Sequence, residues 1–219
     1  LARLPHSVYA LEVDSKRNTL IVGHNYEGIH VIDLAEKKES WNLKLSTAAI
    51  FDLKVFGEEL FVATGDGLLV VVDLEARAIK RHIKLSSKSI RVLAIAPIKK
   101  HLALGFSDHS IQVMDLSTDA APVTRLEGHS NSVFALAYSP DEKVLVSGAR
   151  DACLKFWNAS SYSLDEKIVA HLYAINFLSF RQDGNYLVTC SMDKSLKIWD
   201  VANRSLLKVI DKARNAGHG

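Results

Sequence analysis

The sequence contains few cysteines: Cys153 and Cys190 are the only two in 219 residues. Two cysteines are too few for the disulfide framework of a small secreted domain, and no cluster of histidine and cysteine has the spacing of a zinc site. Each cysteine lies in an apolar stretch of strand length, so we expect two buried, reduced thiols rather than a disulfide or a reactive thiol. The sequence therefore predicts no metal and no cofactor.

The chain also lacks an excess of charge of either sign and a long apolar run. It has 27 basic and 25 acidic residues, a net charge of +2, which does not favour binding to nucleic acid or to acidic lipid. No apolar stretch approaches the roughly 20 residues of a membrane span, and no signal peptide is visible. Hydrophobic residues make up 48% of the chain, as in globular proteins. We expect a cytoplasmic protein that binds neither nucleic acid nor membrane.

The segment Glu127–Asn158 contains three short apolar runs, at residues 133–138, 144–146 and 153–157. Each run has the length of a strand and is bounded by serine, proline, aspartate or glycine, which are typical of turns. A Gly-His pair opens the segment and a Trp-Asn pair closes it. The following segment has the same pattern and closes on Trp199-Asp200.

Two sequence markers recur with one period along the whole chain. The apolar anchors of the first strands are Val8, Ile50, Ile90, Val133 and Ile175, which are 42, 40, 43 and 42 residues apart. The closing dipeptides are Ile32-Asp33, Val72-Asp73, Met114-Asp115, Trp157-Asn158 and Trp199-Asp200, which are 40, 42, 43 and 42 residues apart. The markers predict five repeats, at about residues 5–45, 46–85, 86–127, 128–169 and 170–210.

The repeat resembles the WD40 repeat, which forms one four-stranded blade of a β-propeller. The resemblance implies an all-β fold of antiparallel four-stranded blades with essentially no helix, in one domain over residues 1–219. WD40 rings most often have seven blades. Residues 1–4 predict a surplus fourth strand and residues 216–219 the opening of another repeat, so we expect a section of a seven-bladed ring completed by further blades. The alternative is a closed ring of five blades.

The polarity of the strands differs within each repeat. The third strands are often continuously apolar, as at residues 68–72, which is typical of a strand buried on both faces. The fourth strands are more polar and suit an outer edge that faces water. We expect the fourth strands at residues 40–45, 78–85, 123–126, 163–169 and 205–210.

Two groups of polar residues with equal spacing have the composition of a catalytic triad. The resemblance implies a different role, because WD40 blades commonly hold a buried network of tryptophan, serine or threonine, histidine and aspartate. A catalytic site is rarely built twice in tandem, so we favour two structural networks and predict no catalytic residue. The residues are His129, Ser147, Asp151 and Trp157 in one repeat, and His171, Thr189, Asp193 and Trp199 in the next.

The first three repeats depart from this network. Ile32, Val72 and Met114 replace the closing tryptophan, and Leu4, Ser46 and Ser86 stand at the position of the histidine. Aspartate is kept at Asp66 and Asp108, whereas Tyr26 takes its place in the first repeat. We therefore expect these repeats to depend more on aliphatic packing.

The remaining histidines show no spacing typical of metal ligands, so we expect them to be exposed on strands or in loops. They are His6, His24, His30, His82, His101, His109 and His218.

In WD40 proteins, the resemblance implies, partners bind at the upper face, where loops surround the central channel. This face is lined by residues beside the first-strand anchor and by the residue before the turn aspartate. The first set is Tyr9, Phe51, Arg91, Phe134 and Asn176, and the second is Asn25, Gly65, Ser107, Arg150 and Met192. Aromatic and arginine side chains are enriched where proteins bind peptides. The alternative is that the three aromatic residues only fill the channel entrance.

We therefore predict a non-enzymatic scaffold that binds a protein or peptide partner. The alternative is a propeller enzyme or sugar-binding protein that uses the same channel mouth. That function would require clustered carboxylates or histidines, and the residues expected to line the mouth include neither.

Overall fold

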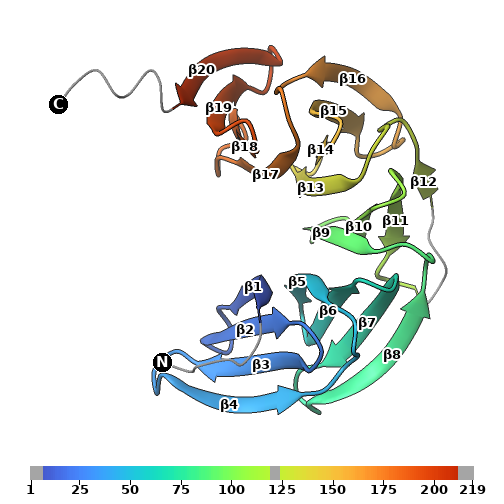
Figure 1. Ribbon diagram of the computed structural model, residues 1–219, viewed down its shortest axis with the longest axis vertical. Helices are drawn as coiled ribbons and strands as arrows, with labels where there is room; N and C mark the ends of the chain where they lie inside the picture. Colours follow the sequence, from blue (N-terminus) through green and yellow to red (C-terminus); the bar gives the residue numbers. More distant parts are fainter. Residues whose placement is uncertain (1–6, 119–123, 212–219) are drawn as a thin grey trace. The chain divides into compact units, whose positions relative to one another are not determined.

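The computed structural model describes residues 7–118 and 124–211 (Figure 1). These residues form twenty strands in five four-stranded sheets and no helix, which confirms the predicted all-β fold. The described part accordingly has no helix that is long and apolar enough to cross a membrane. Residue contacts divide the chain into two compact units, Leu1–Leu93 and Ala94–Gly219.

The first unit contains two complete antiparallel sheets, in the orders β1-β2-β3-β4 and β5-β6-β7-β8. The strands of the first sheet are β1 (Val8–Asp14), β2 (Thr19–His24), β3 (Gly28–Asp33) and β4 (Lys38–Leu43). Those of the second are β5 (Ile50–Phe56), β6 (Glu59–Thr64), β7 (Leu68–Asp73) and β8 (Ala78–Lys84).

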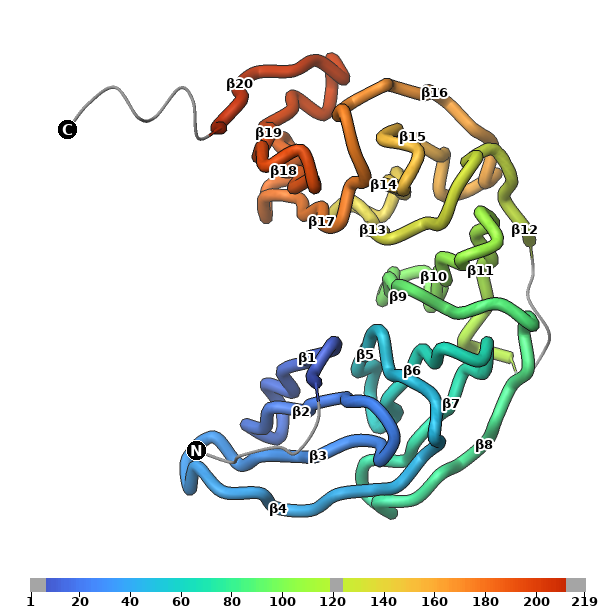
Figure 2. The backbone as a smooth tube through the Cα atoms, in the orientation of Figure 1, coloured from blue at the N-terminus to red at the C-terminus, as the bar shows by residue number. Residues whose placement is uncertain are grey.

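The second unit also contains two complete sheets, β13-β14-β15-β16 and β17-β18-β19-β20. Their strands are β13 (Val133–Tyr138), β14 (Val144–Ala149), β15 (Cys153–Asn158), β16 (Leu164–Val169), β17 (Ile175–Phe180), β18 (Tyr186–Ser191), β19 (Ser195–Asp200) and β20 (Ser205–Asp211). The division between the units falls within β9 (Ile90–Ala96). The sheet of β9 also contains β10 (His101–Phe106), β11 (Ile111–Asp115) and β12 (Thr124–Leu126). Figure 2 shows the chain running back and forth through the strands of each sheet.

The closing aspartate or asparagine of each repeat has a local structural role. Each of these side chains accepts the backbone N–H of a residue two or three positions further along, within the turn between the third and fourth strands. Short Asp and Asn side chains stabilise turns by accepting hydrogen bonds from nearby backbone N–H groups. The residues are Asp33, Asp73, Asp115, Asn158 and Asp200. The need for a turn acceptor explains why this marker persists where the tryptophan before it does not.

Burial follows the predicted polarity of the strands. In β7 the residues Leu69–Val72 are fully buried, whereas β16 and β20 on the outer edges are mostly exposed. The fourth strands lie within two residues of their predicted bounds. Of the residues in these predicted fourth strands, Val123 lies outside the described residues. Residues 1–4 and 216–219, on which the expectation of further blades depends, also lie outside the described residues.

Neighbouring sheets in each unit contact each other mainly through their first strands, β1 with β5 and β13 with β17. The approach requires glycine at matching positions. A Cβ atom on Gly23 would lie 2.5 Å from Cγ2 of Ile50, and one on Gly148 would lie 2.7 Å from Cγ2 of Ile175. The apolar side chains around these contacts form one core cluster in each unit.

Candidate functional site

The fourth sheet brings His129, Ser147, Asp151 and Trp157 into one hydrogen-bonded chain. The indole Nε1 of Trp157, on β15, donates to Oγ of Ser147, on β14, over 2.9 Å. The same oxygen lies 2.7 Å from Nε2 of His129, in the loop before β13. Nδ1 of this ring lies 2.9 Å from Oδ2 of Asp151, in the turn between β14 and β15. The chain thus ties the loop before the first strand to the turn before the third.

The fifth sheet repeats this geometry. Trp199 Nε1 donates to Oγ1 of Thr189 over 3.0 Å, and that oxygen lies 2.8 Å from Nε2 of His171. Nδ1 of His171 lies 2.8 Å from Oδ2 of Asp193. Both networks predicted from the sequence are therefore assembled, with similar distances, by two repeats whose sequences differ elsewhere.

The donor pattern fixes the direction of the hydrogen bonds. An indole only donates, so the hydroxyl of Ser147 accepts from Trp157 and donates to His129, whose Nδ1–H then donates to Asp151. Burial lowers the pKa of His129, although Asp151 opposes this shift. Burial acts to raise the pKa of Asp151, but hydrogen bonds from His129 and from the N–H of Ser130 hold it well below its usual range. A neutral imidazole therefore lies beside an ionised carboxylate.

The burial of this network argues against a catalytic role. Ser147 and Thr189 are both fully buried, and His129 and His171 are nearly so. A nucleophilic hydroxyl must be within reach of a substrate atom. The oxygen of Ser147 is enclosed between an indole and an imidazole, so its position favours a structural role.

The second and third sheets retain only part of the polar arrangement. Thr64 Oγ1 donates to Asp66 over 2.5 Å, and Ser110 Oγ donates to Asp108 over 2.6 Å. Val72 stands where the tryptophan would be, and it is fully buried in the core cluster of the first unit.

Three of the residues predicted for the upper face lie together in the first unit. The rings of Tyr9 and Phe51 have centroids 6.0 Å apart, and Cζ of Arg91 lies 4.2 Å from the centroid of Phe51. Tyr9 is exposed, whereas the other two are partly buried. Partial burial lowers the pKa of Arg91. The three side chains form a cation–aromatic stack, which we call the Phe51 cluster.

The other four predicted residues of this face lie in the second unit. Phe134 is partly buried, and Arg150, Asn176 and Met192 are exposed. The N–H of Arg150 donates to the carbonyl of Ser132, and the N–H of Met192 donates to that of Ala174. These bonds hold each turn against the start of the first strand. Asn25 and Gly65 make the same backbone bond in the first two sheets. The joining of residues from both units into one channel mouth stays a prediction.

The sequence interpretation missed two residues beside Met192. Leu172 is 83% exposed and Tyr173 is 64% exposed, and Met192 is 63% exposed. Ser191 Oγ donates to the carbonyl of Tyr173, and the N–H of Leu172 donates to Asp193, so the two loops lie side by side. We call Leu172, Tyr173 and Met192 the fifth-sheet patch. The signal was present in the sequence, because polar Ser130 and Asn131 follow the histidine of the preceding repeat.

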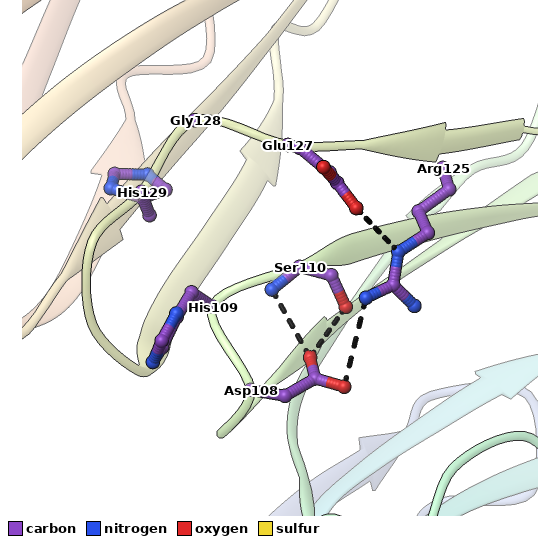
Figure 3. A pocket seen from close by; sticks show the side chains of 7 residues that line it. All are labelled: Asp108, His109, Ser110, Arg125, Glu127, Gly128 and His129. Carbon is purple, nitrogen blue, oxygen red and sulfur yellow. Dashed lines mark hydrogen bonds and ion pairs between the residues drawn. The ribbon is translucent and has the colours of Figure 1, made fainter.

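A polar hollow of about 300 Å³ lies near His129 (Figure 3). Its lining includes Asp108, His109 and Glu127, the residue types that a sugar-binding site or hydrolase would need. Arg125 lies between the two carboxylates, with Nε 3.1 Å from Glu127 and Nη2 3.8 Å from Asp108. Because this cation already engages both acids, the arrangement does not resemble an acid and base pair awaiting substrate.

The expectation that the remaining histidines are exposed is wrong for His24 and His30. His101 is partly buried, and His6 and His218 lie outside the described residues. His24 is fully buried and only 13% of the His30 side chain is exposed. Their rings stack with centroids 4.7 Å apart. They are not i,i+4 neighbours on a helix but lie on adjacent strands, where pairing of Val22 with His30 places both rings on one face. Together with Glu27 they are the residues, within the described part of the chain, whose geometry could hold a metal ion.

The two cysteines do not meet. Both are free, Cys153 buried in β15 and Cys190 partly buried in β18. Burial raises the pKa of the Cys153 thiol, so this thiol is held in its unreactive protonated form.

Comparisons with known proteins agree with this geometry. The family model described as "WD domain, G-beta repeat" matches residues 120–158 and 163–200. The chain is 30% identical over 110 residues to "WD repeat and SOCS box-containing protein 1" of Takifugu rubripes, covering 49% of this chain and 26% of that protein. It is 26% identical over 161 residues to "Eukaryotic translation initiation factor 3 subunit I" of Culex quinquefasciatus, covering 66% of this chain and 49% of that protein.

The fold also matches a chain in the crystal structure of a mitotic checkpoint complex. The TM-score is 0.84 at 22% sequence identity, over 93% of this chain and 63% of that one. The chain thus spans half or less of the length of the two relatives. The family model matches the two repeats that carry the complete network, and the fold match extends over those that lack it. These findings support a WD40 β-propeller protein, with WD40 repeats at residues 120–158 and 163–200.

Proposed function

We propose that this chain is a non-enzymatic scaffold that binds a protein or peptide segment through the loops before the first strands and the turns before the third strands. The fifth-sheet patch is the observation that carries the proposal. Three large, mainly apolar side chains protrude there from two loops, which are held together by one backbone–backbone hydrogen bond and by two bonds between backbone and side chain. Loops presented on a rigid sheet are where binding residues are disproportionately found.

The chemistry of the patch fits a peptide with apolar side chains. Burial of a large apolar side chain contributes about 1.5–3 kcal/mol. Methionine adapts to ligands of different shape, and tyrosine combines a large apolar surface with a hydroxyl. The backbone bonds reduce the entropy that the loops would lose on binding.

The Phe51 cluster supports the same function in the first unit. Arginine and aromatic side chains contribute most to binding free energy at interfaces. Arg91 lies over Phe51 and is partly desolvated. Binding of a partner's carboxylate would therefore cost less desolvation at Arg91 than at a fully hydrated arginine. The relative from Culex quinquefasciatus is named as a subunit, which supports a role within an assembly. The cytoplasmic location stays a prediction.

Selection from a displayed peptide library provides the test, because it requires no known partner. We expect peptides selected against the wild-type chain to lose at least about tenfold in affinity, about 1.4 kcal/mol, for the double variant Tyr173→Ser/Met192→Ser. The control is Leu207→Ser on the outer strand β20, which is also an exposed apolar residue. Retention of affinity by the double variant, with an unchanged melting temperature, would refute the proposed binding patch.

A further inference from the structure

The hairpin of β2 and β3 carries three potential metal ligands within seven residues. His24 ends β2, Glu27 lies in the turn, and His30 is the third residue of β3. The pairing of Val22 with His30 and of His24 with Gly28 makes the two histidines diagonal neighbours on one face of the sheet. The turn between β2 and β3 places the side chain of Glu27 beside the two histidines.

The three donor groups are close together. One ligand atom of each residue lies within 4.8 Å of the other two, and Nε2 of His24 lies 3.9 Å from Oε2 of Glu27. Donor atoms bound to tetrahedral zinc at about 2.0–2.2 Å are roughly 3.3 Å apart. Binding of one ion by all three residues would therefore require the donor atoms to approach one another by up to about 1.5 Å. Glu27 can supply much of this movement, because 49% of its side chain is exposed and its bonds can rotate.

One of the two rings is oriented by a backbone acceptor. Nδ1 of His24 lies 2.9 Å from the carbonyl oxygen of Asn25, so Nδ1 carries the proton and Nε2 keeps the lone pair that a metal ion needs. Nδ1 of His30 lies 3.2 Å from Oε2 of Glu39, but it is buried without a hydrogen bond. Metal-binding histidines usually show the arrangement of His24, in which a carbonyl or carboxylate orients the ring.

An ion could reach this cluster from solvent. A hollow of about 290 Å³ is lined by Glu27, Ile29, His30, Asn42, Leu43 and Lys44. Lys44 lines the hollow and opposes a cation there, whereas the carboxylate of Glu27 in the same lining attracts one. The hollow leaves room for water as a fourth ligand.

We propose that His24, Glu27 and His30 bind one divalent transition-metal ion of the zinc class. Two imidazoles and one carboxylate suit Zn²⁺, Co²⁺ or Ni²⁺, whereas Mg²⁺ and Ca²⁺ prefer oxygen ligands alone. The ion would brace the turn between β2 and β3. In the fourth and fifth sheets the corresponding turn is tied down by the histidine and aspartate network, and the first sheet has Tyr26 in place of that aspartate.

Titration of the untagged, chelator-treated chain with Zn²⁺, followed by calorimetry, tests the proposal. We expect one equivalent to bind and to raise the melting temperature, and Co²⁺ to give the visible absorption of a site with nitrogen ligands. Glu27→Gln keeps the size of the side chain at a half-exposed position, so the variant should fold and lose at least about tenfold in affinity. His30→Gln should lose most of the binding.

Two control variants test whether binding depends on these three residues and not on any exposed carboxylate or histidine. Glu36→Gln removes an exposed carboxylate from the same sheet, and His109→Gln removes an exposed histidine in the second unit. Both should bind Zn²⁺ as the wild type does. A wild-type chain that binds no Zn²⁺, or binding that is unchanged in Glu27→Gln and His30→Gln, would overturn the proposal.

Discussion

Glu142, in the turn between β13 and β14, accepts the backbone N–H of Lys99, in the hairpin between β9 and β10, over 2.8 Å. Its other carboxylate oxygen accepts the N–H of Ile98, also over 2.8 Å. The first unit uses the same device, because Oδ2 of Asp52 on β5 accepts the N–H of Leu93 on β9 over 2.7 Å. Acidic side chains of one sheet thus satisfy backbone donors of the next, in addition to the apolar contacts between sheets.

This relationship predicts a specific cost for removing the carboxylate. Glu142→Ala should reduce the free energy of unfolding by about 1–3 kcal/mol, because two backbone donors lose their acceptor. Glu142→Gln keeps one carbonyl acceptor and should cost less. Both variants keep a side chain at a positive φ of 53°, so the difference between them in urea denaturation reports the hydrogen bonds. Equal stability of the two variants would contradict this account.

Truncation of Trp157 tests the structural role of the network. Trp157→Ala should cost about 3–5 kcal/mol as a core truncation, and His129→Ala about 1–3 kcal/mol because buried polar groups lose partners. Denaturant unfolding measures both. The structural interpretation would be wrong if the chain showed a hydrolytic turnover that Ser147→Ala abolished without a change in stability.

The buried histidines of the two networks, His129 and His171, make the stability of the chain depend on pH. Burial lowers the pKa of His129 and of His171 in the folded chain, whereas in the unfolded chain each has a pKa of about 6.5. As pH falls below about 6.5, the unfolded state takes up protons that the folded state does not. The free energy of unfolding should therefore decrease on acidification.

A second decrease in the free energy of unfolding should follow at lower pH. Asp151 and Asp193 have folded pKa values below the usual range, since the hydrogen bonds they accept outweigh burial. Their contribution is present above the unfolded value of about 3.9 and declines below it. Melting temperatures between about pH 7.5 and pH 2 measure both losses. His129→Gln should flatten the upper one, and a chain whose stability rose on acidification would exclude this mechanism.

Apolar residues at the surface of the first and fifth sheets predict association of this chain. Leu11 and Val13 project from the same side of β1 and are exposed. In the second unit Phe180, Tyr186 and Val188 line an apolar hollow of about 420 Å³. Exposed apolar surfaces of this kind favour association, so we expect self-association in sedimentation experiments.

Variants of exposed apolar residues on β1 and on β20 test this prediction of self-association. Leu11→Ser/Val13→Ser should reduce the self-association, whereas Leu207→Ser on the outer strand should not. A wild-type chain that stays monomeric at high concentration would contradict this prediction.

The sequence by itself determined the all-β fold, the strand order within each repeat and the residues of the two networks. Each depends on chemistry within about 40 residues, such as the turn acceptors Asp33 and Asp200 and the equal spacing from Ser147 to Asp151 and from Thr189 to Asp193. Local hydrogen bonding and alternating polarity leave a mark in the sequence whenever they recur with a fixed period.

The tertiary structure decided which side chains meet and which face solvent. The sequence interpretation placed His24 and His30 at the surface, but strand pairing stacks them on a covered face. It overlooked Leu172 and Tyr173, because a loop residue becomes a binding candidate only when a neighbouring turn, here that of Met192, lies beside it. Burial and proximity depend on strand register and on the packing of other segments, and neither is encoded at a fixed spacing along the chain.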